Sequence, residues 1–116
     1  MAERRMFAKT ITESDAFTQL PLGAQALYFH ICMANADDDG FANAPTKIQR
    51  MIGAKKSDLQ ALIDANFLIA FPSNVVVVKH WKMHNTIQNE RYKPTVYEEE
   101  KAKLIVKSNR AYSLKK

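Results

Sequence analysis

The sequence predicts an α+β fold of the winged helix-turn-helix class, in which a helical core carries a small antiparallel β-hairpin. Three observations predict it. Two short helical patterns lie within residues 45–66, two β-branched or aromatic runs follow over residues 67–78, and turn residues separate those runs. We therefore divide the chain into an N-terminal arm with a short helix (1–20), a winged-helix domain (21–82) and a basic C-terminal extension (83–116).

The two helices of the predicted helix-turn-helix are marked by their apolar spacing and their ends. Residues 46–52 place three apolar side chains on one side of a helix. Gly53 ends that helix, because glycine takes up a left-handed conformation without steric cost. Ser57 is expected to cap the second helix, about 57–66, with Asp58 in its positive first turn.

The hairpin is predicted by the run 67–71, the turn residues 72–74 and the valines 75–78. Phe41 and Ala42 are expected to form a small third strand beside it. After Pro94, residues 96–106 are expected to form a helix, and the last ten residues are expected to fray.

The residues before the motif suggest self-association. A short helix is predicted over residues 12–20 and a longer one over residues 22–36, starting after Pro21. The longer helix is apolar more than halfway round, which is typical of a helix at the centre of a core or shared with a partner subunit. The candidate oligomer interface comprises Met6, Phe7, Phe29 and Met33.

Charge is distributed unevenly along a chain whose net charge is +5. Residues 1–78 hold seven basic and eight acidic residues, whereas residues 79–116 hold ten basic and four acidic ones. A polyanion such as nucleic acid would meet the second part first. The alternative is a solvated, lysine-rich tail without a partner.

Size and composition limit the other function classes. A chain of 116 residues has room for one globular domain, and an apolar content of 47% suffices for a core. The longest apolar run is too short to cross a membrane, and no secretory leader is expected. Cys32 is the single cysteine of the sequence, so a reducing cytoplasm is the expected setting.

Two patterns could bind a metal, and for both another interpretation is preferred. Asn35, Asp37 and Asp39 alternate as in the first half of a calcium loop, but Thr46 stands where a bidentate glutamate should be, so a polar turn is expected. His80 and His84 have helical zinc-ligand spacing without an evident third ligand, so a packing or hydrogen-bonding role is favoured. No catalytic motif is present, and no enzyme activity, metal or cofactor is expected.

The second helix of the motif would enter the major groove of DNA. Gln60 could contact a base edge there, whereas Asp64 would repel phosphates. Lysines and arginines around the motif and after the hairpin are expected to bind phosphate, with Trp81 near bases or sugars. The candidate DNA-binding residues are Lys47, Arg50, Lys55, Lys56, Gln60, Lys79, Trp81, Lys82, Arg91 and Lys93.

Several segments together resemble the N-terminal domain of phage replisome organisers, which are replication initiation proteins related to the DnaD-type primosomal proteins. The resemblance covers about nine-tenths of the chain and is specific in combination. It is carried by residues 2–7, 26–30, 38–41, 47–54, 76–81, 84–85 and 91–97.

The resemblance implies a self-associating winged-helix domain in DNA replication that contacts DNA and helps to recruit a helicase loader or the replicative helicase. Two other functions remain open at this point. The domain could be a protein–protein oligomerisation module that binds no DNA, or a phage transcriptional regulator with a sequence-selective recognition helix.

Overall fold

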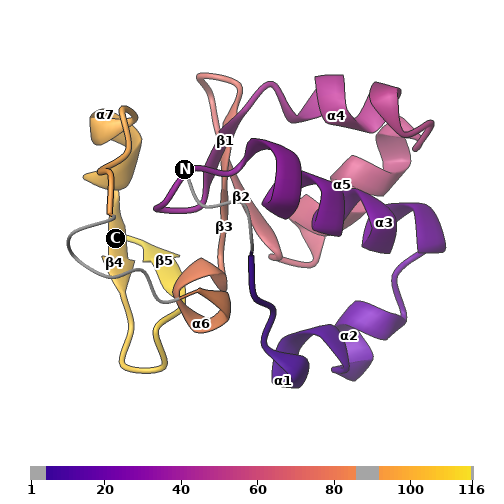
Figure 1. The fold of residues 1–116 in the computed structure, drawn as a ribbon, viewed down its shortest axis with the longest axis horizontal. Helices are drawn as coiled ribbons and strands as arrows, with labels where there is room; N and C mark the ends of the chain where they lie inside the picture. The colour runs from indigo at the N-terminus through magenta and orange to yellow at the C-terminus, as the bar shows by residue number, and fades with distance from the viewer. Residues whose placement is uncertain (1–4, 86–91, 116) are drawn as a thin grey trace.

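A three-stranded antiparallel sheet forms the centre of the computed structural model, which describes residues 5–85 and 92–115. Its strands are β1 (Phe41–Asn43), β2 (Leu68–Phe71) and β3 (Val75–Val78), in the order β1-β3-β2. Phe41 lies opposite Val77, and Leu68 lies opposite Val78. All four valines of β3 are buried, because the strand is central and the sheet is covered on both faces (Figure 1).

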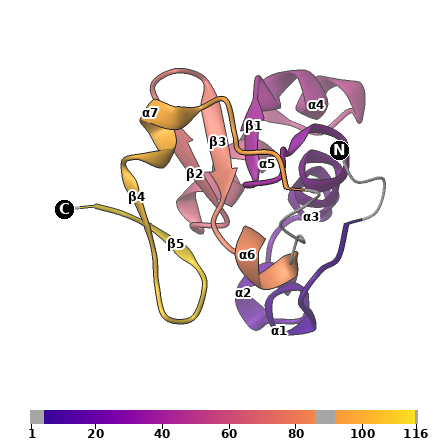
Figure 2. The same ribbon diagram turned by 60° about the vertical axis from the view of Figure 1, so that its left-hand side comes forward.

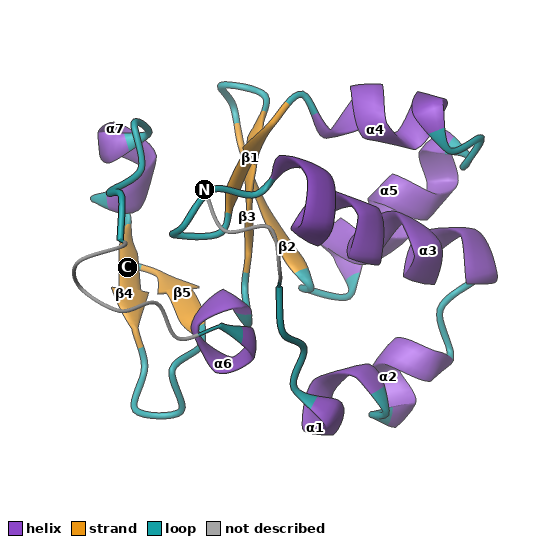
Figure 3. Ribbon diagram, viewed as in Figure 1, coloured by secondary structure: helices purple, strands orange, loops and turns teal. Residues whose placement is uncertain are grey.

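Helices cover one face of this sheet (Figures 1 and 3). The core of that layer comes from Leu27, Tyr28 and Leu62, which are fully buried. Helix α3 (Leu22–His30) continues directly as a π-helical turn, η1 (Ile31–Asn35). The elements of this layer are α1 (Lys9–Thr12), α2 (Asp15–Thr18), α3 (Leu22–His30), η1 (Ile31–Asn35), α4 (Pro45–Met51) and α5 (Lys56–Asp64).

The C-terminal residues cover the other face. They form α6 (Trp81–His84), α7 (Glu98–Lys101) and a two-stranded sheet of β4 (Leu104–Val106) and β5 (Tyr112–Leu114). The Phe41 ring packs against Tyr97 and Tyr112 from this layer, with ring centroids 6.3 and 6.2 Å apart. The central sheet therefore lies between a helical layer formed by residues 9–64 and a second layer formed by the C-terminal residues after β3.

Several predicted elements are confirmed. The hairpin β2–β3 turns over residues 72–74, where Asn74 has a positive φ of 65°. Phe41 and Ala42 belong to a strand beside β3. Gly53 ends the helix before it with a φ of 76°, in the left-handed region that favours glycine.

Other predicted elements are wrong in detail. The expected helix over 96–106 stops at Lys101, because the β-branched pair Ile105 and Val106 belongs to the strand β4. The C-terminal end that was expected to fray contains the strand β5. Ser57 does not cap α5. The cap position is Lys55, whose backbone N–H donates to the Asp58 carboxylate at 2.9 Å.

The predicted helix over 12–20 is shorter than expected and corresponds to α2, while α1 precedes it. Ser14 separates them, and its hydroxyl accepts a hydrogen bond from the backbone N–H of Phe17 at 3.3 Å. Within the described part of the chain, no helix has both the length and the apolar character needed to cross a bilayer.

Candidate nucleic-acid interface

A positively charged corner is formed where α4 turns into α5, and we call it the α4–α5 corner. Lys47 and Arg50 lie on α4, Lys55 caps α5 and Lys56 begins it, and all four residues are exposed. The sharp turn at Gly53 brings the two helices together (Figure 1). The three ion pairs among the described residues all involve Asp38 or Asp39, so none of the four cations of the α4–α5 corner forms an ion pair within the described part of the chain.

The charge on the exposed side of α5 changes from positive at Lys56 to negative at Asp64. Gln60 lies one turn after Lys56, and its amide donates to the Asp64 carboxylate at 2.8 Å. This bond uses one of the two N–H donors of Gln60, so the other N–H and the side-chain carbonyl stay free for the predicted base contact, next to the negative charge of Asp64. Anions would meet the beginning of α5 more favourably than its end.

Lys79 and Lys82, expected on the wing, lie at the opposite end of the hairpin from its turn. Lys79 is half-buried, and its backbone is held between the Phe67 carbonyl (3.2 Å) and the Tyr112 N–H (2.8 Å). The Lys82 ammonium lies 4.0 Å from the Asp39 carboxylate and 5.9 Å from the Tyr112 ring centroid. Both lysines thus follow the hairpin, as expected, and they lie away from its turn because the chain enters α6 directly after β3.

The turn between β2 and β3 contacts an acidic helix. The Ser73 hydroxyl donates to the Glu100 carboxylate at 2.5 Å, and this bond lowers the pKa of Glu100. Glu98 and Glu99 precede it on α7, which lies beside the turn between β2 and β3 (Figure 2). The turn between β2 and β3 is therefore flanked by negative charge.

Trp81, expected to contact bases or sugars, is a core residue. It is 1% exposed, and its indole N–H donates to the Asp38 carbonyl at 3.0 Å. Gly40 packs so closely that a Cβ there would lie 2.5 Å from the indole Cγ. Burial thus removes Trp81 from any nucleic-acid surface. Lys93 is exposed, and Arg91 lies outside the described residues.

The four residues expected at an oligomer interface divide into two pairs. The rings of Phe7 and Phe29 pack edge-to-face within the chain, with centroids 4.9 Å apart. These two rings therefore cover each other. Met6 and Met33 remain 56% and 46% exposed.

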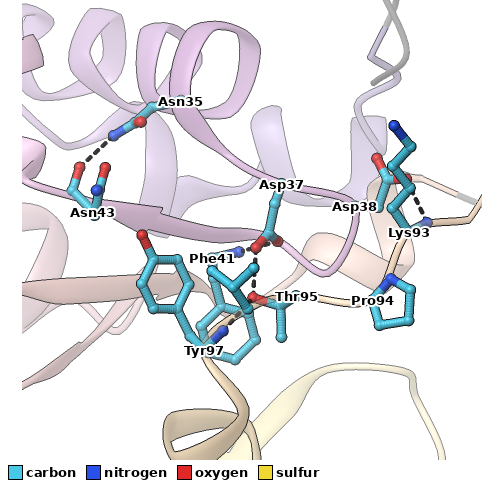
Figure 4. Close-up of a pocket in the computed structure, with 10 residues that line it drawn as sticks. Asn35, Asp37, Asp38, Phe41, Asn43, Lys93, Pro94, Thr95 and Tyr97 are labelled. Carbon is cyan, nitrogen blue, oxygen red and sulfur yellow. Dashed lines mark hydrogen bonds between the residues drawn. The ribbon is translucent and has the colours of Figure 1, made fainter.

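The acidic loop 37–39 forms a hub that sequence reasoning missed, and we call it the aspartate hub. Asp37 closes the turn, since its carboxylate accepts the N–H groups of Asp39 (2.9 Å) and Phe41 (3.0 Å). It also accepts the hydroxyl of Thr95, as Figure 4 shows. A hollow of about 250 Å³ lies beside this contact, between the loop and residues 93–97.

Asp39 is the centre of the hub. It is fully buried, and its carboxylate accepts the Tyr92 hydroxyl at 2.7 Å, the Thr95 N–H at 2.9 Å and the Lys101 ammonium at 3.3 Å. Its carbonyl accepts the Tyr112 hydroxyl at 2.8 Å. Each of these contacts ties the C-terminal layer to the loop before β1.

Asp38 joins the N-terminal arm to the same hub. The Arg5 guanidinium lies 3.5 Å from its carboxylate, donates to the Ala36 carbonyl at 2.9 Å and sits 4.9 Å from the Trp81 ring centroid. The backbone N–H of Lys93 also donates to Asp38 at 3.0 Å. The aspartates therefore balance buried or half-buried cations of the chain itself.

His84 is a second tether for the arm. Its Nδ1 accepts the backbone N–H of Ala8 at 2.8 Å, and its Nε2 lies 2.6 Å from the Tyr28 hydroxyl. Burial lowers the pKa of His84 to about 4, with a smaller contribution from the charge of His80. Burial also raises the pKa of Tyr28 and of the Cys32 thiol beside it, so all three groups stay neutral.

Sequence reasoning found the residues of the α4–α5 corner. It missed the aspartate hub and the exposed cations of the β4–β5 hairpin. The available signal for the hub was three consecutive aspartates next to an apolar strand. The missed exposed cations are Lys103, Lys107, Arg110 and Lys115.

In residues 5–85 and 92–115, no group of three or more His, Cys, Asp or Glu side chains is arranged to hold a metal ion. Comparisons with protein-family models, curated proteins and solved structures found no match.

Proposed function

We propose that this chain is a winged-helix module of a phage-type DNA replication initiation protein, which binds duplex DNA through the α4–α5 corner. The order of its elements supports the winged-helix interpretation. Helix α3 is followed by β1, then by the pair α4 and α5, then by the hairpin β2–β3, and the strands pair in the order β1-β3-β2. A helix-turn-helix places its second helix, here α5, in the major groove.

The observation that carries the proposal is the group of four exposed cations at the α4–α5 corner. Lys55 and Lys56 lie at the beginning of α5, the helix that would approach DNA, and Lys47 and Arg50 lie on the helix before it. The helix dipole also favours an anion at the beginning of α5. The described residues offer these cations no carboxylate partner. Binding of this kind is governed by phosphates and varies little with sequence.

Self-association and the recruitment of helicase-loading machinery complete the proposal. They rest on the resemblance to replisome organisers and on the exposed apolar side chains of Met6 and Met33. A replication role places the protein in the cytoplasm, where the free thiol of Cys32 would stay reduced.

Fluorescence anisotropy with a short labelled duplex of random sequence, at two ionic strengths, tests the DNA-binding part. Each double reversal at the corner, Lys47→Glu with Arg50→Glu or Lys55→Glu with Lys56→Glu, should weaken binding. The slope of log affinity against log salt should also fall by about one for each lost phosphate contact. The matched control is Lys9→Glu with Lys107→Glu, at two exposed lysines outside the corner.

Two results would overturn the proposal in favour of the other functions. A stable oligomer in light scattering, with no DNA binding even at low salt, would indicate a protein-interaction module. A large affinity ratio between one operator and random DNA would indicate a transcriptional regulator.

A further inference from the structure

The hollow beside the aspartate hub has the size of one ring system. Its volume is about 250 Å³, below the range of about 300–1,000 Å³ that is usual for drug-sized ligands. It is bounded by the strand β1, the end of η1 and residues 93–97. The lining residues that keep some exposed surface and concern its chemistry are Asn35, Asn43, Lys93, Pro94, Val96 and Tyr97.

Part of this lining is apolar and partly open to solvent. The half-buried Tyr97 ring packs on the buried Phe41 ring, with centroids 6.3 Å apart, so it has a fixed support. Val96 is 82% exposed, and Pro94 is exposed as well, so both side chains stand at the opening. A supported aromatic ring with one accessible side is a platform on which a nucleobase stacks.

Two amide side chains lie beside this platform. Asn43 follows Phe41 by two positions on β1, so both side chains point to the face of the sheet that Tyr97 covers. The Asn35 amide nitrogen donates to the Asn43 carbonyl at 2.6 Å, which leaves the side-chain oxygen of Asn35 as an acceptor. Within residues 5–85 and 92–115, the Asn43 side chain and the Tyr97 hydroxyl form no hydrogen bond.

A cation stands at the other end of the hollow. Figure 4 shows Lys93 there, away from the two amides, and its ammonium takes part in none of the ion pairs among the described residues. Asp37 and Asp38 also line the hollow, but Asp37 accepts the Thr95 hydroxyl, and Asp38 lies 3.5 Å from the Arg5 guanidinium. The exposed charge at this end is therefore positive.

We propose that this hollow binds one unpaired adenine-type nucleobase, with the phosphate of the same nucleotide at Lys93. The base stacks on Tyr97, its exocyclic amine donates to the side-chain oxygen of Asn35, and the Asn43 amide donates to its ring nitrogen. Thymine has no exocyclic amine for Asn35, so it is expected to bind more weakly.

A single strand of DNA and a free nucleotide both offer this chemistry. The single-strand source rests on the proposed function. Helix α4 starts two positions after Asn43 and leads to the α4–α5 corner, and its seven residues span about 10 Å, so a strand that leaves a duplex at the corner can reach the hollow. A paired base is stacked and uses its edge within the duplex, so duplex DNA does not fill this site.

An abasic oligonucleotide that carries one adenine, one thymine or no base is the probe for the strand. In fluorescence anisotropy, the adenine should tighten binding about tenfold over the abasic strand, and the thymine should tighten it less. Deoxyadenosine monophosphate is the probe for the free nucleotide and should shift the side-chain amide signals of Asn35 and Asn43 in nuclear magnetic resonance spectra. Such shifts without a gain from adenine in the strand would assign the site to a free nucleotide.

Substitutions separate stacking from edge recognition. Tyr97→Leu keeps an apolar wall and should remove the gain from either base, whereas Asn43→Ala should make adenine and thymine equal. Gln19→Ala is the matched control, because it removes an exposed amide outside the hollow. Lys55→Glu with Lys56→Glu should weaken all three strands equally and keep the gain from adenine. Circular dichroism spectra establish that the variants are folded.

The phosphate contact has its own readout. Deoxyadenosine should bind more weakly than its monophosphate, and Lys93→Gln should abolish this difference. Lys107→Gln, at an exposed lysine of the β4–β5 hairpin, should preserve it.

Three results would overturn the proposal. The first is equal binding of the three strands together with unshifted Asn35 and Asn43 signals in the presence of the nucleotide. The second is a gain from adenine that survives both Tyr97→Leu and Asn43→Ala. The third is protection of Val96 and Tyr97 by self-association without nucleotide, which would assign the hollow to a second copy. Duplex binding without any gain from adenine would remove this inference alone, whereas nucleotide binding without duplex binding would remove the proposed function alone.

Discussion

Replacing Asp39 by asparagine should weaken the attachment of the C-terminal layer to the central sheet and so destabilise the protein. Asparagine has nearly the same shape, but it is neutral and offers one acceptor oxygen in place of two. The carboxylate accepts hydrogen bonds from Tyr92, Thr95 and Lys101, and Lys82 lies 4.0 Å away. The substitution therefore removes charge and an acceptor without creating a cavity.

The expected loss of stability follows from these contacts. One buried hydrogen bond to a charged acceptor contributes about 2 kcal/mol, and the two partly exposed lysine contacts add about 0.5 kcal/mol each. Asp39→Asn should thus lower the free energy of unfolding by about 3 kcal/mol, which corresponds to a fall of about 12 °C in Tm for a domain of this size.

Urea unfolding followed by circular dichroism and by Trp81 fluorescence measures this loss. Asp64→Asn is the matched control, because Asp64 is exposed and bonds to Gln60 alone in the described structure, so its effect should stay within about 0.5 kcal/mol. Equal effects of the two substitutions would refute the role of the aspartate hub. So would a separate transition for the C-terminal layer in the unsubstituted protein.

Three further predictions address other parts of the structure. Gly40→Ala should lower the free energy of unfolding by about 3 kcal/mol, because a φ of +86° is combined with a clash against the buried indole of Trp81. Gly53 has a φ of +76° but lies in open space, so Gly53→Ala should lower it by about 1 kcal/mol in the same unfolding assay. The free energy of unfolding should fall by about 2.5 kcal/mol as pH drops from 6.5 to 4, because the unfolded chain protonates His84 near its ordinary pKa while the folded pKa is about 4. His84→Gln should flatten this part of the pH profile, and an unchanged profile would contradict the tether to Ala8. Replacing the three glutamates 98–100 by glutamine should tighten duplex binding about threefold in anisotropy, since it removes negative charge beside the turn between β2 and β3. Unchanged affinity would place this turn outside the DNA footprint.

The hairpin and the helix pair could be predicted because their signals are local. Turn residues, β-branched runs and apolar spacing act over a few positions, and the structure places β2, β3, α4 and α5 accordingly. The corner cations were predicted for the same reason, since Lys47 and Arg50 stand on the polar side of a short helical pattern and Lys55 and Lys56 stand in the turn after it.

The aspartate hub could not be predicted from local pattern. The residues that donate hydrogen bonds to the Asp39 carboxylate lie 53 to 62 residues away in the sequence, and its burial follows from packing of the C-terminal layer. Trp81 was misassigned because an aromatic residue between basic ones fits both a binding surface and a covered core. The strand β4 was missed because three glutamates at residues 98–100 favour a helix start, and that helix ends after one turn.

Amide chemical-shift mapping with unlabelled duplex DNA tests the central claim most directly. The account predicts that the largest shifts fall on residues 47–50 and 55–60 and disappear at high salt, while signals at the buried Trp81 and the β4–β5 hairpin stay in place. Shifts centred on the β4–β5 hairpin, or no shifts at low salt, would contradict it.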